Sequence, residues 1–218
     1  MSVKKISSGR RRSRPVAPKK TNLNVKIIII TVIAIIIIAL AVYLIMVNNS
    51  DEKDDSNIGG NSIAVFDTTL GTFRVELYQD KMPETCENFI KLANDEFFNG
   101  MNFYRVLDGF MIQAGRFFPD GSEKQSPYGN INFEESDVKH VDGAISMAST
   151  GDKVGGSAEF FICDGEQKGL DGRYAAFGVT IEGLDVVHDI ADADHDNSHP
   201  AGGGKPYTDI VINSITIE

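Results

Sequence analysis

Residues 103 to 117, FYRVLDGFMIQAGRF, combine Arg105 and Gln113 with many large apolar and aromatic side chains. The stretch contains no Ser, Cys, His, Glu or Lys that could act as a nucleophile or a strong base. A guanidinium is permanently charged, planar and rich in N–H groups, so it is well suited as a hydrogen-bond donor. The stretch therefore argues against covalent catalysis by its own side chains, and its composition alone does not say which chemistry it serves.

The loop at 192–206 also contains residue types that could bind a metal. It has neither the spacing of an EF-hand nor a paired-ligand motif, so we interpret it as a solvated loop and expect no metal site. Its GGGK run at 202–205 lacks the first Gly and the Ser or Thr of a phosphate-binding loop, and it precedes a strand. The potential ligands are Asp192, Asp194, His195, Asp196 and His199.

A hydrolase triad is not indicated either. No Ser lies in a G-x-S-x-G turn, and the four His residues occur in ordinary contexts. We expect His140 to pack beside a strand and His188 to lie on a helix face.

The charge of the chain is divided into two opposite parts. The formal charge is −10, yet residues 1–26 contain nine Lys and Arg and no acidic residue. The remaining residues therefore carry 12 basic against 31 acidic side chains, a balance of −19. A domain this acidic repels phosphate backbones, so we expect no nucleic-acid partner for the folded part.

Residues 27–47 are 21 consecutive positions without a charge, a Pro or a Gly. A helix of this length spans about 30 Å, the thickness of a bilayer core. We predict a transmembrane helix, preceded by a basic cytoplasmic arm at 1–26 and followed by an extracytoplasmic domain. A cleaved signal peptide is the alternative, but the apolar run is long and no A-x-A site follows it. The Ile-rich span hints at a bacterial cell membrane.

Residues 48–61 are polar, acidic and rich in Gly at their end, which predicts a flexible linker with a reach of about 20 Å. The folded domain then covers residues 62–218. It holds the two cysteines of the chain, Cys86 and Cys163. An even number permits a disulfide, but a domain of this size needs none, and we expect two buried thiols.

Short runs rich in strand-forming residues dominate residues 62–218. Helical periodicity occurs at 83–95, where Cys86, Phe89, Ile90 and Ala93 share one face, and at 183–191. Many short strands with two helices indicate a mainly antiparallel barrel or sandwich. The predicted strands are 62–68, 72–78, 110–114, 143–148, 159–163, 174–181 and 210–217.

Several motifs follow one another in this domain. They are P-E-T-x-E-N-F at 83–89, F-x-R-V and G-F-M-I-Q-x-G within 103–115, S-M-A at 146–148, E-F-F-I-C at 159–163 and L-D-G-x-x-x-x-F-G at 170–178. Through this ordered set the chain resembles the cyclophilin family of peptidyl-prolyl cis-trans isomerases. The resemblance implies a mainly β fold, an eight-stranded antiparallel barrel closed by two α-helices, here preceded by the predicted transmembrane helix.

The resemblance also implies an enzyme of class EC 5.2.1.8, which rotates X–Pro peptide bonds without a cofactor. It implies that three residues are catalytic: Arg105 donates to the prolyl nitrogen, Gln113 binds the substrate backbone and helps to place Arg105, and Phe110 forms part of the wall around the proline ring. Without the resemblance, Phe110 and Phe161 would be interpreted as ordinary core residues, and Arg105 could equally be a surface residue of a half-exposed strand. The implied substrate-binding residues are Phe103, Met111, Ala148, Ser149, Glu159, Phe161, Leu170 and Tyr174.

The chain departs from the family pattern at four positions. Tyr104 and Tyr174 stand where His is common, and Gly169 stands where some members have Trp, so we expect weak binding of cyclosporin. Glu159 stands where many members have Gln. Its charge would either pair with Arg105 or compete with a substrate.

The expected function is folding assistance to exported proteins at the outer face of the cell membrane. The partners would be proline-containing polypeptides and, through residues 27–47, the lipid bilayer; the catalytic domain would act as a monomer. Two alternatives stay open. The groove could bind Pro-containing segments without turnover, or the barrel could be incidental to a scaffolding membrane protein.

Overall fold

The computed structural model describes residues 27–30, 32–34, 36, 61–135 and 137–218. Residues 27–30, 32–34 and 36 are helical. No helix among the described residues has both the length and the apolar character needed to cross a membrane. The predicted basic arm, most of the predicted transmembrane helix and nearly all of the predicted linker lie outside the described residues.

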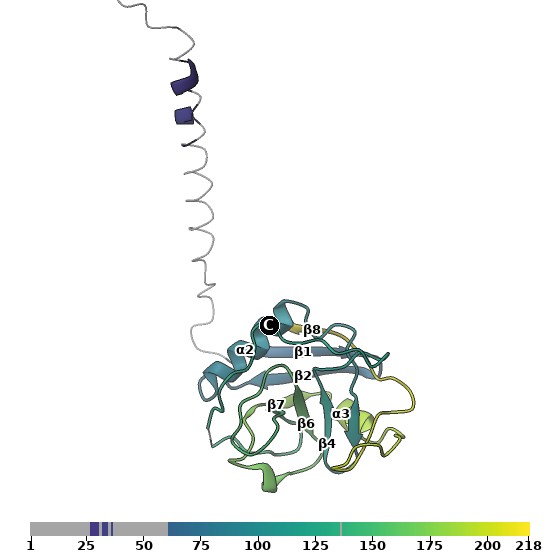
Figure 1. Ribbon diagram of the computed structural model, residues 1–218. Coiled ribbons are helices and arrows are strands. Elements are labelled where there is room, and N and C mark those ends of the chain that lie inside the picture. The colour runs from purple at the N-terminus through teal and green to yellow at the C-terminus, as the bar shows by residue number, and fades with distance from the viewer. Residues whose placement is uncertain (1–26, 31, 35, 37–60, 136) are drawn as a thin grey trace, which may run out of the picture. The chain divides into compact units, whose positions relative to one another are not determined.

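Eight antiparallel strands form one sheet in the C-terminal domain (Figure 1), in the spatial order β3-β4-β6-β5-β7-β2-β1-β8. The two edges of the sheet also meet, because the N–H of Phe103 donates to Ile210 at 2.9 Å and that of Ile212 donates to Met101 at 2.8 Å. The sheet therefore curls into a barrel. Its strands are β1 (Ile63–Thr68), β2 (Gly71–Leu77), β3 (Arg105–Leu107), β4 (Met111–Ala114), β5 (Ala144–Met147), β6 (Phe160–Cys163), β7 (Ala176–Glu182) and β8 (Ile212–Ile217).

Two α-helices pack on the sheet, α2 (Pro83–Asn94) against β8 and α3 (Leu184–Ala191) against β2. Helix α2 begins at a Pro, whose fixed φ suits the first helical turn, and Glu84 in that turn complements the helix dipole. A short 3-10 helix, η1 (Lys168–Leu170), precedes β7. Both predicted helices are confirmed.

The interior contains two separate apolar clusters. The main core is rich in fully buried Phe rings, including Phe66 stacked on Phe73 at a centroid distance of 4.5 Å and Phe89 edge-on to Phe160 at 5.6 Å. The second cluster is smaller and is partly open to solvent. It consists of Met111, Ala144, Phe161 and Cys163, with Leu107, Phe110, Ala148, Leu170 and Tyr174 packed against them.

The seven predicted strands agree with the structure to within two residues at each end. The predicted set lacks β3, because three residues are too few to show an alternating pattern. Cys86 and Cys163 are free and buried, as expected. Burial raises the pKa of each thiol to about 12, so both stay protonated at neutral pH.

Candidate active site

Strand register brings the key polar residues together. Arg105 of β3 is paired with Gln113 of β4, and Gln113 is paired with Phe161 of β6. Directly opposed residues project to the same face of a sheet. Segments separated by many residues along the chain therefore place a guanidinium, an amide and an aromatic ring in one row.

This row borders a cavity of about 260 Å³. Most residues to which the family resemblance gave a catalytic or substrate-binding role lie around it. Two further residues, from the loop before β8, complete the lining. The full set is Arg105, Phe110, Met111, Gln113, Ala148, Ser149, Phe161, Leu170, Tyr174, His199 and Ala201.

The apolar wall of the cavity is formed by the second cluster, not by the main core. Met111 and Phe161 are only 2% and 6% exposed, while Phe110, Leu170 and Tyr174 are partly exposed. The ring of Tyr174 meets that of Phe161 edge-on at 5.9 Å. Phe110 and Phe161 therefore line an open cavity, so the alternative that they are ordinary core residues does not fit the structure.

Arg105 is 8% exposed and is held by three acceptors. Its Nε donates to the carbonyl of Gly202 at 2.9 Å, one Nη donates to Ala201 at 3.1 Å, and the other Nη donates to Oε1 of Gln113 at 3.3 Å. Its guanidinium carbon lies 5.7 Å from the centroid of the Phe110 ring. Burial lowers the pKa of Arg105, although the guanidinium remains a cation at any physiological pH.

A guanidinium has five N–H groups. Three of those in Arg105 have the acceptors described above, and the others have no hydrogen-bond partner among the described residues. Arg105 can therefore keep its position and still donate to a bound molecule. The alternative that Arg105 is a surface residue of a half-exposed strand does not fit its burial.

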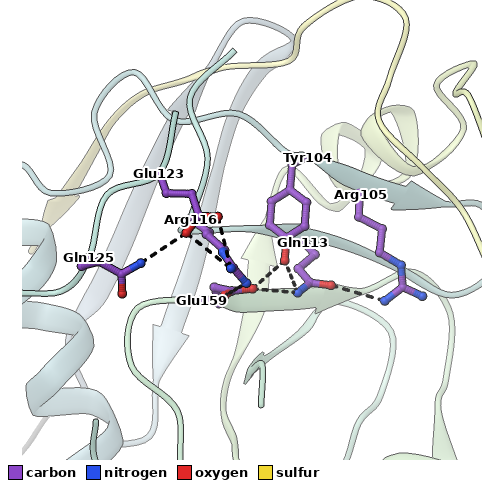
Figure 2. A network of polar contacts seen from close by, with 7 residues as sticks. All are labelled: Tyr104, Arg105, Gln113, Arg116, Glu123, Gln125 and Glu159. Carbon is purple, nitrogen blue, oxygen red and sulfur yellow. Dashed lines mark hydrogen bonds and ion pairs between the residues drawn. The ribbon is translucent and has the colours of Figure 1, made fainter. Parts of the chain in front are cut away.

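The side chain of Gln113 connects Arg105 to a polar network (Figure 2). Its Nε2 donates to the hydroxyl of Tyr104 and, at 3.2 Å, to Oε2 of Glu159. The hydroxyl of Tyr104 donates to the same oxygen of Glu159 at 2.6 Å, and Arg116 donates to the other oxygen at 3.3 Å. Glu159 thus pairs with Arg116 and not with Arg105, contrary to one of the two expectations for it.

Glu159 lines a neighbouring cavity of about 340 Å³. Gln113, Ala148, Ser149 and His199 contribute to both cavities, so the two adjoin. The substrate-binding role of Glu159 stays a prediction.

Phe103 does not fit the substrate-binding role predicted for it. It is 0% exposed and belongs to the main core. Strand β3 begins only at Arg105, so the alternation that would place Phe103 on the same face as Arg105 does not extend that far. The chain at Phe103 instead pairs with Ile210, and its ring points into the barrel interior.

The loop before β8 contributes to the site in a way that no sequence pattern indicates. The carbonyls of Ala201 and Gly202 hold Arg105, and the ring of His199 lines both cavities. The N–H of Ala201 donates to Nδ1 of His199 at 3.2 Å, which requires this nitrogen to be unprotonated. Burial and the nearby charge of Arg105 lower the pKa of His199, in agreement with a neutral ring. Backbone carbonyls have no sequence signature, so only coordinates could show this.

A chain of Asp171, His140 and Ser146 lies behind the cavity. Nδ1 of His140 is 3.1 Å from Asp171 and its Nε2 is 3.1 Å from the hydroxyl of Ser146. The order of groups is that of a hydrolase triad, but Ser146 is 0% exposed and cannot meet a substrate. The ring of His140 stacks on Phe161 at 5.9 Å, so the chain supports the cavity wall.

Asp142, Asp164 and His188 are the one set of three or more described residues whose geometry could hold a metal ion. Each already has a protein partner. Asp142 accepts from the N–H of Gly165 at 2.8 Å and lies 3.1 Å from Nε2 of His188, and Asp164 accepts from the N–H of Gly109 at 2.6 Å. The bond from Gly109 to Asp164 holds the turn between β3 and β4 that presents Phe110.

Comparisons with known proteins agree with this geometry. The family model for cyclophilin type peptidyl-prolyl cis-trans isomerase/CLD matches residues 63–217. A peptidyl-prolyl cis-trans isomerase of Synechococcus elongatus is 40% identical over 133 residues, which cover 60% of this chain and 90% of the relative. The peptidyl-prolyl cis-trans isomerase-like 3 of Gallus gallus is 35% identical over 153 residues, which cover 69% and 92%.

Solved structures show the same likeness. A cyclophilin type peptidyl-prolyl cis-trans isomerase of Cryptosporidium parvum matches with a TM-score of 0.64 at 28% identity, over 72% of this chain and 97% of that one. Its structure in the presence of the dipeptide Ala-Pro matches with the same TM-score and identity. Since the family model spans well over half of the sequence, the chain belongs to the cyclophilin-type peptidyl-prolyl cis-trans isomerases.

Proposed function

We propose that this isomerase is anchored in a bacterial cell membrane by residues 27–47 and acts on exported proteins at the outer face. The support is in the sequence, where 21 residues without a charge follow a segment with nine basic residues and no acidic one. X–Pro bonds of newly exported chains isomerise in tens to hundreds of seconds without a catalyst. A catalyst kept near the membrane would meet these chains as they emerge.

Arg105 supplies the catalytic step in this proposal. Rotation of an X–Pro bond has a barrier of about 20 kcal/mol, because the planar amide is stabilised by resonance. At the top of the barrier the prolyl nitrogen carries a localised lone pair. The unpaired N–H groups of Arg105 would meet that lone pair only in the twisted form, which is differential binding of the transition state.

The apolar wall contributes a second effect. The twisted amide is less dipolar than the planar one, so it loses less solvation when it enters a dry site. Phe110, Met111 and Phe161 provide such a surface beside Arg105. The dipeptide Ala-Pro, present with the similar Cryptosporidium parvum protein, is the class of ligand that we propose for this cavity.

The burial of Arg105 beside an open cavity, with N–H groups that have no partner among the described residues, is the observation that carries the catalytic part of the proposal. The test is isomerisation of an X–Pro peptide by the full-length protein and by its Arg105→Ala and Arg105→Lys variants. We expect Arg105→Ala to reduce kcat/KM at least about tenfold, which corresponds to about 1.4 kcal/mol of transition-state stabilisation. Arg105→Lys should recover little, because an ammonium cannot bind all three acceptors and also donate to a substrate.

Arg74→Ala is the matched control, since this Arg pairs with Glu182 and Glu218 and lines neither cavity. It should keep the activity of the unmodified protein. Circular dichroism should show that the variants are folded. Equal kcat/KM for the unmodified protein and Arg105→Ala would reject the role of Arg105. Peptide binding without turnover in the unmodified protein would favour the binding-module alternative.

A further inference from the structure

The direction of the Gln113 amide is fixed by groups on both of its sides. On one side Oε1 accepts from Arg105 at 3.3 Å. On the other side Nε2 donates to the hydroxyl of Tyr104 and to Oε2 of Glu159. An amide has a donor end and an acceptor end that occupy nearly the same space, so its neighbours decide which end points where.

Tyr104 can only accept from Gln113 because its single proton is already in use. That proton is donated to Glu159 at 2.6 Å. Burial, followed by the charge of Glu159, raises the pKa of Tyr104 far above neutrality, so the phenol keeps its proton. Gln113 therefore faces a carboxylate and a hydroxyl lone pair, two acceptors that attract its NH₂ group and repel its carbonyl.

We propose that Tyr104 and Glu159 are positioning residues that fix the direction of the Gln113 amide, so that its oxygen faces Arg105 and holds the guanidinium beside the cavity. A reversed amide would direct its oxygen at Glu159 and its NH₂ group at a cation, two unfavourable contacts. The arrangement in Figure 2 shows the sequence of contacts from Glu159 through Tyr104 and Gln113 to Arg105.

The position of Glu159 is itself held from two directions. Arg116, which also pairs with Glu123 at 3.3 Å, donates to its outer oxygen at 3.3 Å. Gly115 has a φ of +95°, and a Cβ there would lie 2.3 Å from the carbonyl oxygen of Ala158. The absence of a side chain at Gly115 lets the segment that carries Glu159 approach β4 closely.

This proposal rests on the proposed role of Arg105, and a double-mutant cycle on the full-length protein separates the two. The variants are Tyr104→Phe, Glu159→Gln and Gln113→Ala, alone and in pairs, assayed for kcat and KM on an X–Pro peptide. We expect Tyr104→Phe to lower kcat about threefold to tenfold, the range that one hydrogen bond of ordinary strength represents, with little change in KM. In the Gln113→Ala background the same change should have almost no further effect.

Glu159→Gln tests the effect of the charge. The Gln side chain is neutral, but its amide oxygen can still accept a hydrogen bond from Gln113. This variant should lower kcat less than Tyr104→Phe does, and its effect should also vanish in the Gln113→Ala background. The side-chain NH₂ signals of Gln113 in a ¹H–¹⁵N spectrum should shift in both variants, because each variant alters one of the two acceptors of this group.

Tyr128→Phe is the matched control. The hydroxyl of Tyr128 also donates to a carboxylate, that of Asp95, but Tyr128 lines neither cavity. This variant should leave kcat and the Gln113 signals unchanged. Additive effects of Tyr104→Phe and Gln113→Ala in an active protein would overturn the positioning role and leave that of Arg105 intact. If Arg105→Ala kept full activity, the proposed function itself would fail.

Discussion

At the scale of single residues, the site keeps one strong cation in a nearly buried place without pairing it to a carboxylate. Arg105 is bound by two backbone carbonyls and one amide oxygen. These acceptors are dipoles and not charges, so they orient the guanidinium without neutralising it. The nearby carboxylate, Glu159, is paired with Arg116 instead. The charge of Arg105 is therefore available to a substrate.

His140 makes the stability of the domain depend on pH. Burial lowers its pKa in the folded state, against the opposing effect of Asp171, whereas an unfolded His titrates near about 6.5. Folding therefore favours the neutral ring. The stability that this provides is complete above the unfolded pKa and is lost as the pH falls from there through the lowered folded pKa. Thermal unfolding between pH 7.5 and pH 5 should show a falling Tm.

His140→Gln should flatten this dependence, although the variant will be less stable at every pH because it loses the bonds to Asp171 and Ser146. Asp171 does not titrate in this pH range. Burial raises its pKa, but hydrogen bonds from His140 and the charge of Lys139 outweigh this effect and hold the pKa below its usual value. Parallel curves of Tm against pH for the two proteins would show that another group causes the loss.

At the scale of elements, the loop before β8 is attached to β3 by a short two-stranded contact. Val106 and Gly204 exchange two main-chain hydrogen bonds, at 3.0 and 3.2 Å. This attachment brings the carbonyls of Ala201 and Gly202 to Arg105. The loop therefore positions the guanidinium of Arg105, although it contributes only backbone groups and one His ring to the cavity.

Gly203→Ala should detach this loop. Gly203 has a φ of +73°, and a Cβ there would lie 2.3 Å from the carbonyl oxygen of Val106. The substitution adds about 1–2 kcal/mol of backbone strain and a clash, so the loop must move away from β3. We expect kcat/KM on an X–Pro peptide to fall several-fold, because Arg105 loses acceptors.

Gly121→Ala is the control that introduces backbone strain without displacing the loop before β8. Gly121 also has a positive φ, +84°, but a Cβ there would meet nothing within 4 Å. This variant should lose only the stability that corresponds to the backbone strain, and it should keep its activity. Should the two variants retain equal activity, the loop would not be what holds Arg105 in place.

The elements differ in how far the sequence predicts them. Strands such as β2 alternate clearly and helix α2 begins at Pro83, so local pattern is sufficient to find both. The three-residue β3 has no pattern of its own and exists because β4 pairs with it. Phe103 was placed wrongly for the same reason, since alternation was extended across a strand boundary.

The cavity could be predicted only where side chains form it. Motif residues such as Arg105 and Phe161 are recognisable because their types recur in the family. His199 and the carbonyls of Ala201 and Gly202 come from a loop that looks solvated, and their role depends on tertiary contacts alone. The Tyr104 and Glu159 pair could be identified as a departure from the family, but its partner Arg116 required coordinates.

At the scale of the whole molecule, charge separates the chain into functional parts. Residues 1–26 carry nine positive charges, and the rest of the chain carries 31 acidic against 12 basic residues. Anionic lipid surfaces attract the first part and repel the second. If the chain is anchored as proposed, this distribution disfavours contact between the acidic domain and an anionic lipid surface.

The proposed topology can be tested by adding a protease to intact cells that express the chain with different epitopes at its two ends. Because basic flanks remain in the cytoplasm, we expect the C-terminal epitope to disappear while the N-terminal epitope survives. Isomerase activity of the cell surface should be lost in parallel. Deletion of residues 27–47 is the matched control, since without this apolar run the domain should stay inside the cell and be protected. In lysed cells the protease should remove both epitopes from either protein. Survival of the C-terminal epitope on intact cells that express the complete chain would contradict an extracytoplasmic domain, and loss of the N-terminal epitope alone would indicate the reverse orientation.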